Sequence, residues 1–191
     1  MISKTTVLYT NPPAHLKNQF RSVNCDVPCF WPRHSHGIVW NVRVDNVQFT
    51  MSMEGEQIYP LLKLSNRDET HRIASTRFDS DIPLPYFSWA EYNIQAAPAP
   101  FELPGASFVA SNCHSRSGRE AMVQELMKHT RVDSYGACLR NKRATNDNKR
   151  EIVRKYAVHL AFENQCTDDY ITEKLWGVFD AGVIPVYYGA P

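Results

Sequence analysis

Acidic, amide, aromatic and basic side chains gather in one short stretch between two apolar runs. The first run is 157–163 (AVHLAFE) and the second is Val183–Tyr188, and each reads as a buried strand. Between them the pattern predicts a polar loop at 164–169 and an amphipathic helix from Tyr170 to Ala181. Gly182 follows at the position of a left-handed helix cap. The stretch therefore predicts a strand–loop–helix–strand unit whose two strands are parallel.

The junction between this loop and this helix has the side chains of an anion site. Ligands of open α/β sheets bind at the carboxyl ends of the strands, and a helix N-terminus attracts phosphate because it carries about half a positive charge. Lys174 adds a full charge suited to a diphosphate, and Glu173 can accept hydrogen bonds from sugar hydroxyls. Asp168 or Asp169 is the predicted N-cap. The sequence has no glycine-rich phosphate loop, and a surface helix with a solvated Glu–Lys pair explains the same spacing.

The order of motifs in this stretch resembles one family. LAFEN, then DYITEKLW, then AGVIPVYYGAP resemble the donor-binding signature of the α1,3/α1,4-fucosyltransferases, glycosyltransferase family 10. Upstream, MSMEG (51–55), FDSDIPLPYFSWAEYN (78–93), SFVASNC and VDSYGAC (132–138) resemble further elements of that family, and SWAEY is similar to its plant-type members. The resemblance covers residues 46–191 and is weaker before them.

The resemblance implies an α/β, GT-B-like fold made of two Rossmann-like domains, with the donor domain incomplete in this chain. We expect an acceptor-side domain at 1–95, a proline-rich linker at 96–104 and a GDP-fucose-binding donor domain at 105–191. Strand and helix patterns alternate regularly in the donor domain, which by itself favours a parallel sheet.

Hydrophobic patterns predict the other elements of both domains. In the first domain, strands are expected at Thr5–Tyr9, Gly37–Val44, Val47–Met51 and Arg72–Arg77, with a turn or partial helix at Tyr59–Asn66. In the second domain, the predicted elements are a strand at Ser107–Ser111, a helix at Gly118–His129, a strand at Val132–Tyr135 and a helix at Lys149–Tyr156.

The resemblance also implies an activity, which is transfer of L-fucose from GDP-fucose to a GlcNAc hydroxyl of a glycan with inversion at the anomeric carbon. The linkage would be α1,3 or α1,4, in an N-glycan core or a Lewis-type glycan. Such a transfer needs a carboxylate that takes the proton of the attacking hydroxyl. By resemblance this base is Glu54, in the MSMEG element, and Glu56 is the second candidate because alternate residues of a strand share a face. Without the resemblance, Glu54 would read as an exposed strand-end carboxylate.

Phosphate-binding roles fall to three residues by the same resemblance. Arg119 is expected at the start of the first donor-domain helix, where an arginine can grip a diphosphate through two parallel hydrogen bonds. Lys174 would bind the same group, and Asn164 would lie near the phosphates. Arg116 is close enough in sequence to take the place of Arg119, and either arginine could instead be a solvated surface residue.

The remaining donor-site residues are expected at the ribose. By resemblance Tyr170 and Glu173 hold the ribose of GDP-fucose, and Glu163 supports the site. Tyr170 has a second interpretation, as a core aromatic at the base of the helix, because buried tyrosines are common.

Two patterns have the appearance of metal sites. Asp79 and Asp81 have the Asp-x-Asp spacing that holds divalent cations in other sugar-nucleotide transferases, but a strand or turn explains them as well. The CxxxC and HxH patterns within residues 25–36 match no strong zinc spacing. We therefore expect no metal site and no required cofactor, although some members of the family are stimulated by manganese.

Five cysteines leave one unpaired if the others form disulfides. Cys113 and Cys138 each follow a predicted donor-domain strand, and adjacent parallel strands bring their ends within the roughly 6 Å that a disulfide needs. In an oxidising lumen this pair would be bridged, and Cys166 is the candidate unpaired thiol. In a reducing compartment all five would stay thiols.

Composition restricts the partners. The net charge is +1, and the basic residues are scattered apart from a basic run at Arg140–Arg150 (RNKRATNDNKR), which reads as a solvated loop. Nothing therefore indicates nucleic acid or an anionic membrane surface. No apolar run reaches the roughly 18 residues needed to cross a bilayer, and the first residues lack a signal-peptide pattern. The family implies a type II membrane protein of the Golgi with a luminal catalytic domain, so we expect this chain to lack both the anchor and the end of the donor domain. The alternatives are an inactive relative that keeps part of a nucleotide site and a non-enzymatic α/β interaction domain.

Overall fold

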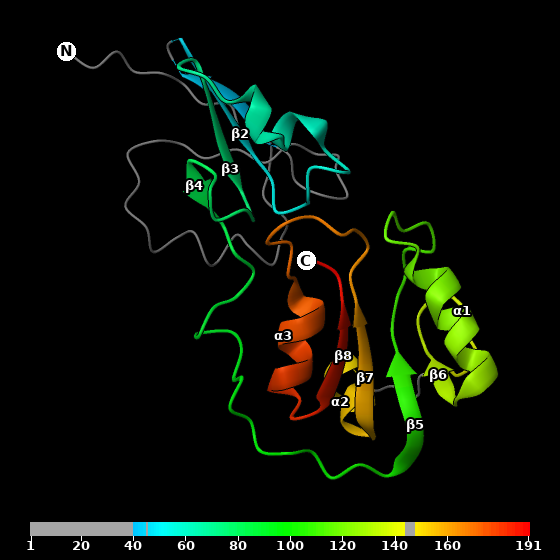
Figure 1. Ribbon diagram of the computed structural model, residues 1–191. Helices are drawn as coiled ribbons and strands as arrows, with labels where there is room; N and C mark the ends of the chain where they lie inside the picture. Colours follow the sequence, from blue (N-terminus) through cyan, green and yellow to red (C-terminus); the bar gives the residue numbers. More distant parts are fainter. Residues whose placement is uncertain (1–39, 45, 144–147) are drawn as a thin grey trace. The chain divides into compact units, whose positions relative to one another are not determined.

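The computed structural model describes residues 40–44, 46–143 and 148–191, which divide into two compact units (Figure 1). Unit 1 contains the described residues up to Ser75 together with Ser80–Ile82, and unit 2 contains Thr76–Asp79 and Pro83–Pro191. The strand predicted at Thr5–Tyr9 and the cysteine–histidine pattern of residues 25–36 lie outside the described residues.

Unit 1 is built on a small sheet with strand order β1-β2-β3-β4. β1 (Trp40–Val44) pairs antiparallel with β2 (Val47–Met51), and β2 pairs parallel with β3 (His71–Ser75); β4 is the short strand Ile82–Pro83. Two 3-10 turns, η2 (Pro60–Leu62) and η3 (Leu64–Asn66), occupy the region for which the sequence predicts a turn or partial helix. Among the described residues of this unit, Leu62 and Ile73 are the most buried apolar side chains.

Unit 2 contains a four-stranded sheet with strand order β6-β5-β7-β8, and all of its neighbouring strands are parallel. The strands are β5 (Leu103–Phe108), β6 (Val132–Ser134), β7 (Tyr156–Phe162) and β8 (Ile184–Tyr188). The connections between successive strands carry the helices α1 (Arg119–His129), α2 (Lys149–Arg154) and α3 (Glu173–Asp180). The predicted α/β class and the alternation of strand and helix in this unit are confirmed.

The side chains of β7 divide the interior of unit 2 into two layers. Leu160 and Phe162 join a cluster with Val123 of α1, whereas Ala161 joins a cluster with Val178 of α3 and with Val153 of α2. Because successive side chains of a strand point to opposite faces, α1 covers one face of the sheet and α2 and α3 cover the other (Figure 1). Full burial of one such side chain contributes about 1.5–3 kcal/mol to folding.

The helices of unit 2 are short. They span 11, 6 and 8 residues, whereas a transmembrane helix needs about 20. Across the described ranges, the structure contains no helix with both the length and the apolar character that a bilayer crossing requires.

The division between the units falls at residues 76–83, earlier than the linker that the prolines of 96–104 predict. The reason is that residues 83–102, which precede β5, pack against the rest of unit 2. Asn93 N donates to the carboxylate of Asp180 (3.1 Å), and Ala99 N donates to the carbonyl oxygen of Gly182 (2.8 Å). Gly182 has φ +69°, and a Cβ there would meet the carbonyl oxygen of Ala97 at 2.1 Å. Both the predicted left-handed cap and this close approach therefore require glycine.

Candidate functional site

A buried carboxylate follows the carboxyl end of β7. Glu163 has no exposed surface, and its Oε1 accepts hydrogen bonds from Thr172 N (2.7 Å) and from the Thr172 hydroxyl (2.9 Å). Lys174 Nζ lies 3.0 Å from Glu163 Oε2. A buried charge is costly unless it is paired and hydrogen-bonded, and Glu163 meets both conditions. It therefore fixes the loop after β7 to the start of α3.

The helix cap of α3 is Thr172, which corrects the prediction of Asp168 or Asp169. Thr172 has an extended backbone, and its Oγ1 accepts from Lys174 N (3.4 Å) and from Lys174 Nζ (2.7 Å). Asp169 instead has φ +58°, and its carboxylate accepts a hydrogen bond from Phe78 N (3.0 Å). Because this residue turns away from helical geometry, α3 begins at Glu173 rather than at Tyr170.

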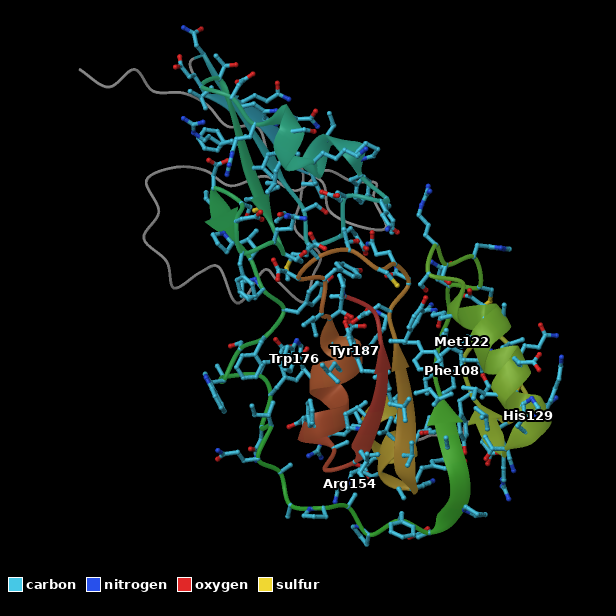
Figure 2. The ribbon with its side chains drawn as sticks, viewed as in Figure 1. Phe108, Met122, His129, Arg154, Trp176 and Tyr187 are labelled. Carbon is cyan, nitrogen blue, oxygen red and sulfur yellow. A yellow bond between two sulfur atoms is a disulfide. The ribbon has the colours of Figure 1, made fainter. Side chains whose placement is uncertain are left out.

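The end of β8 packs against the same residue, Glu163. Glu163 N donates to the carbonyl oxygen of Tyr188 (2.8 Å), and Ala190 N donates to the Tyr187 hydroxyl (2.9 Å). A Cβ at Gly189 would meet Glu163 Cγ at 2.6 Å, so only glycine fits there. Burial raises the pKa of Tyr187, which is labelled in Figure 2, to about 12. Its hydroxyl therefore stays protonated and available for hydrogen bonds at neutral pH.

Arg119 begins α1, close to the predicted helix start, but its side chain points into the protein. It is 3% exposed, and its guanidinium donates to the carbonyl oxygens of Phe162 (3.0 Å) and Asn112 (2.9 Å) and to the Glu120 carboxylate (3.3 Å). These bonds tie the loop after β5 to the carboxyl end of β7. In this structure Arg119 organises the site, and its contact with a diphosphate stays a prediction from the resemblance.

Asn164 lies in the first position of the loop after Glu163, held by the segment before α1. Its carbonyl oxygen accepts from Arg116 N (2.8 Å) and Ser117 N (3.1 Å), and the Ser117 hydroxyl donates to the carbonyl oxygen of Glu163 (2.6 Å). Arg116 thus contacts the site through its backbone. The side-chain oxygen Oδ1 of Asn164 is buried and accepts no hydrogen bond from the described residues. An unpaired buried acceptor costs about 1–3 kcal/mol.

Tyr170 and Glu173, both expected at a ribose, differ in accessibility. Tyr170 is 1% exposed and its ring packs edge-on against Tyr86, with centroids 6.2 Å apart, as in the alternative interpretation of a core aromatic. The Glu173 side chain is 46% exposed. Desolvation opposes its charge, but Lys174 and Lys149 hold the pKa of Glu173 below its usual value. Glu173 is therefore an ionised, accessible acceptor.

Lys149 is a site residue that the sequence interpretation missed. It lines a cavity of about 220 Å³ together with Glu173, Tyr92 and Val153. Desolvation by the surrounding protein, with the positive charge of Lys174, lowers the pKa of Lys149 against the opposing effect of Glu173. In the sequence, Lys149 appears only as the first residue of a helix after a basic run. No local pattern could reveal that Lys149 and Glu173 line one cavity, because the packing of α2 beside α3 creates it.

Glu54, the expected base, lies in unit 1 directly after β2. It is half-buried, and its backbone N–H donates to the Ser52 hydroxyl (3.0 Å). Glu56 lies in a turn, not in a strand, so the argument that alternate residues share a face does not apply to it. The hydrogen bond from Glu54 N to Ser52 lies within unit 1. The role of Glu54 as the catalytic base stays a prediction.

The Asp-x-Asp pair has structural partners. Asp79 pairs with Arg77 (2.8 Å), and the Asp81 carboxylate accepts from Ile73 N (2.9 Å). Among residues 40–44, 46–143 and 148–191, no three His, Cys, Asp or Glu side chains gather in a way that could hold a metal ion.

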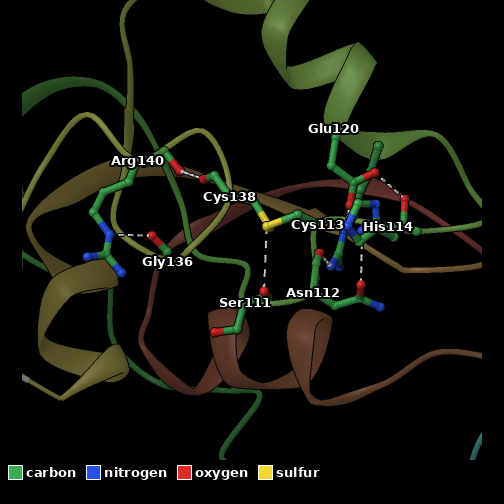
Figure 3. Close-up of a disulfide and its surroundings, with 11 residues drawn as sticks. Ser111, Asn112, Cys113, His114, Glu120, Gly136, Cys138 and Arg140 are labelled. Carbon is green, nitrogen blue, oxygen red and sulfur yellow. Dashed lines mark hydrogen bonds and ion pairs between the residues drawn. A yellow bond between two sulfur atoms is a disulfide. The ribbon is translucent and has the colours of Figure 1, made fainter.

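Cys113 and Cys138 are joined by a disulfide, shown in Figure 3, with their Cα atoms 5.1 Å apart. Cys113 lies in the loop after β5, and Cys138 lies in the loop after the neighbouring strand β6. Cys138 is 2% exposed and belongs to the core on the α1 face. Cys166, in the loop before α3, takes no part in a disulfide.

Comparison with known proteins shows that the segment carrying this site is similar to one family. Residues 104–191 match the family model described as glycosyltransferase family 10 (fucosyltransferase), C-terminal part. A fucosyltransferase-like protein of Arabidopsis thaliana is 40% identical over 144 residues, which are 73% of this chain and 28% of that protein. GDP-fucose protein O-fucosyltransferase 3 of Danio rerio is 48% identical over 94 residues, 44% of this chain and 20% of the relative.

One solved structure, of an α1,3-fucosyltransferase with GDP, is 30% identical, with a TM-score of 0.43, over 53% of this chain and 28% of that one. This chain thus spans between 20% and 28% of the length of these relatives. The family match contains the carboxyl ends of β5 and β7 and the start of α3, and therefore Arg119, Glu163 and Lys174. Residues 104–191 of this chain thus match the C-terminal part of glycosyltransferase family 10, the fucosyltransferases.

Proposed function

We propose that this chain is part of a GT-B-like, inverting fucosyltransferase that transfers L-fucose from GDP-fucose to a GlcNAc hydroxyl of a glycan, in α1,3 or α1,4 linkage. The observation that carries the proposal is the arrangement of Glu163, Thr172 and Lys174 at the N-terminus of α3, inside the segment that matches the family. Backbone N–H groups and an ammonium at one strand end are the groups that a diphosphate needs.

In the proposed reaction, the acceptor oxygen forms a bond to C1 of fucose while the bond from C1 to the β-phosphate oxygen of GDP breaks. The acceptor proton passes to the Glu54 carboxylate, in its role by resemblance as general base. The electron pair of the broken bond stays on GDP, and Lys174 together with the N-terminus of α3 stabilises that negative charge. Arg119 supports this end of the site by holding the backbone after β5 and β7.

A second acceptor class is favoured by the relatives that act as protein O-fucosyltransferases. In that case the attacking group is a side-chain hydroxyl of a protein instead of a sugar hydroxyl. The chemistry at the donor is the same in both cases. Residues outside the Glu163 site would therefore determine which acceptor is used. Transfer assays with a GlcNAc-terminated glycan and with a folded protein domain would separate the two acceptors.

A Golgi lumen is the proposed location of this activity. The disulfide between Cys113 and Cys138 supports this proposal, because disulfides persist in oxidising compartments and are rare in the cytosol. Fractionation of cells that express the natural protein tests the location directly. Recovery in the cytosolic fraction with both cysteines reduced would contradict it.

Calorimetric titration of GDP into this chain tests the donor site. We expect the wild-type chain to bind GDP and the double variant Glu163→Gln/Lys174→Met to bind about tenfold more weakly or not at all. Lys128→Met is the control, because Lys128 is an exposed lysine of α1 paired with Glu125. Equal affinities in the wild type and the double variant would contradict the proposed site, and absence of GDP binding by the wild type would contradict the proposed function.

A further inference from the structure

A short segment that precedes β4 is tied to the loop before α3. Residues Thr76–Asp79 belong to unit 2 although Ser75 and Ser80 on either side belong to unit 1. Arg77 donates from Nε (2.9 Å) and Nη2 (2.8 Å) to the two carboxylate oxygens of Asp79, and from Nη1 to the Asp168 carboxylate (2.8 Å). Phe78 N donates to Asp169 (3.0 Å). Two neighbouring groups of one segment, the Arg77 guanidinium and the Phe78 N–H, thus bind two neighbouring carboxylates of the other.

The loop that receives these bonds has an unusual backbone. Asp169 is one of two described non-glycine residues with positive φ, at +58°, a conformation that few residues other than glycine adopt. Directly after it, the Tyr170 ring packs against Tyr86. Arg77, Phe78 and Tyr86, all residues of unit 2, therefore contact the loop at its two carboxylates and at its buried aromatic ring.

These contacts fix the position of the loop before α3 more than they raise the free energy of unfolding. The Asp79 and Asp168 side chains are 57% and 59% exposed, and exposed ion pairs add little to the free energy of unfolding. An arginine that binds one carboxylate through two parallel bonds is nevertheless strongly directional. Hydrogen bonds to Asp79 and Asp168 raise the pKa of Arg77, so its charge is constant. The third bond of this rigid group then fixes where Asp168 lies.

We propose that Arg77 is a positioning residue for donor binding, which acts by holding the 164–171 loop through Asp168 while Phe78 N holds Asp169. This inference rests on the proposed function, because the loop carries Asn164 at one end and leads into Thr172 and Glu173 at the other. It also gives the FDSD motif a role, since Asp79 orients the arginine that binds the loop.

Four variants and a matched control test the proposal by GDP titration. Arg77→Met should raise the dissociation constant of GDP about tenfold, Asp168→Asn should raise it by a similar factor, and Arg77→Lys should give an intermediate value. The double variant Arg77→Met/Asp168→Asn should bind no more weakly than Arg77→Met, because both changes remove one interaction. Arg131→Met is the control: Arg131 also binds one carboxylate through two bonds, to Asp133 at β6, and its loss should leave GDP affinity unchanged. GDP affinity unchanged by Arg77→Met would overturn the proposal.

Hydrogen–deuterium exchange without GDP separates this inference from the proposed function. Amides of residues 164–171 should exchange faster in Arg77→Met than in the wild type and in Arg131→Met. Equal exchange in the three proteins would show that Arg77 does not hold the 164–171 loop, whatever the affinity for GDP. A second outcome is faster exchange in Arg77→Met while the wild-type chain binds no GDP. Arg77 would then hold the loop, but its role in donor binding and the proposed function would both be overturned.

Discussion

Lys174 Nζ lies 3.0 Å from Oε2 of Glu163, whose carboxylate has no exposed surface, and 2.7 Å from the hydroxyl of Thr172. The lysine that is expected to bind a diphosphate is thus also the partner of a buried negative charge. Removing it changes both ligand binding and folding, and an experiment must separate the two effects. The ion pair allows that separation, because both of its charges can be removed together.

Lys174→Met alone should destabilise the chain by about 3–5 kcal/mol, because it leaves the Glu163 charge buried without a partner. Glu163→Gln/Lys174→Met should recover most of that loss, since no buried charge is left in the double variant. Urea denaturation followed by tryptophan fluorescence measures both free energies of unfolding. If Lys174→Met alone stayed within 1 kcal/mol of the wild type, roughly the size of an exposed pair, the Glu163 carboxylate would not depend on Lys174.

Thr172→Val should cost about 1–2 kcal/mol of stability, because α3 loses its cap and Glu163 loses a hydroxyl donor. Thr172→Ser keeps the hydroxyl and should cost a few tenths of a kcal/mol. Chemical denaturation of the two variants side by side measures the difference, since valine and threonine have nearly the same shape. Equal stability of the serine and valine variants would show that the hydroxyl has no role as a cap.

Cys113→Ser should destabilise the chain by about 3.5 kcal/mol under oxidising conditions, because the disulfide closes a loop of 25 residues in the unfolded chain. A reducing agent should lower the stability of the wild type to that of the variant and leave the variant unchanged. Cys166→Ser is the control, since Cys166 takes no part in a disulfide. If the thermal unfolding midpoint of the wild type were the same with and without the reducing agent, this disulfide would not be present.

The sequence predicts the elements of unit 2 well and the contacts of the site poorly. Period-two and period-3.6 patterns are local, so β7, β8 and α1 are expected within a few residues of their observed bounds. Asp169 satisfies the local preference for an N-cap, yet Thr172 is the cap, because a partner 91 residues away in sequence takes the Asp169 carboxylate. A rule based on neighbouring residues in the sequence cannot predict a hydrogen-bond partner that is so distant in the chain.

The same limit applies to the charged residues of the site. The position of Arg119 at the start of α1 follows from its neighbours, but its burial against Phe162 and Asn112 depends on how β5 and β7 pair. Lys149 reaches the site because α2 and α3 line one cavity, which is a tertiary contact and not a sequence pattern. Glu163 could be placed at a strand end from its apolar neighbours, whereas its complete burial could not.

Acid should destabilise unit 2 through His159. Burial, with the nearby charge of Lys149, lowers the pKa of His159 to about 3 in the folded chain, where its Nδ1 lies 2.8 Å from the Ser107 hydroxyl. In the unfolded chain its pKa is about 6.5. Between these two pKa values, His159 is protonated in the unfolded chain and neutral in the folded chain. The free energy of unfolding should therefore fall by about 1.4 kcal/mol per pH unit from pH 6.5 toward pH 3.

His159→Gln isolates this effect from the other titrating groups. The variant should be less stable at pH 7 but should lose less stability between pH 6.5 and pH 5 than the wild type. Urea denaturation at half-unit pH steps in that range gives the two slopes, before most carboxylates titrate. Parallel slopes would contradict a neutral, buried His159.

Glu54→Ala should abolish fucose transfer and leave GDP affinity nearly unchanged, because the base contacts the acceptor hydroxyl and not the nucleotide. Glu54→Gln should behave alike, since an amide has similar size but cannot take the proton. Glu56→Ala is the matched control, as it removes a carboxylate two residues away that lies in a turn. The measurements are initial rates of transfer from GDP-fucose to a GlcNAc-terminated glycan, with GDP titration of each variant. Turnover by Glu54→Ala within a factor of two of the wild type would exclude Glu54 as the base, and loss of turnover in Glu56→Ala alone would transfer that role to Glu56.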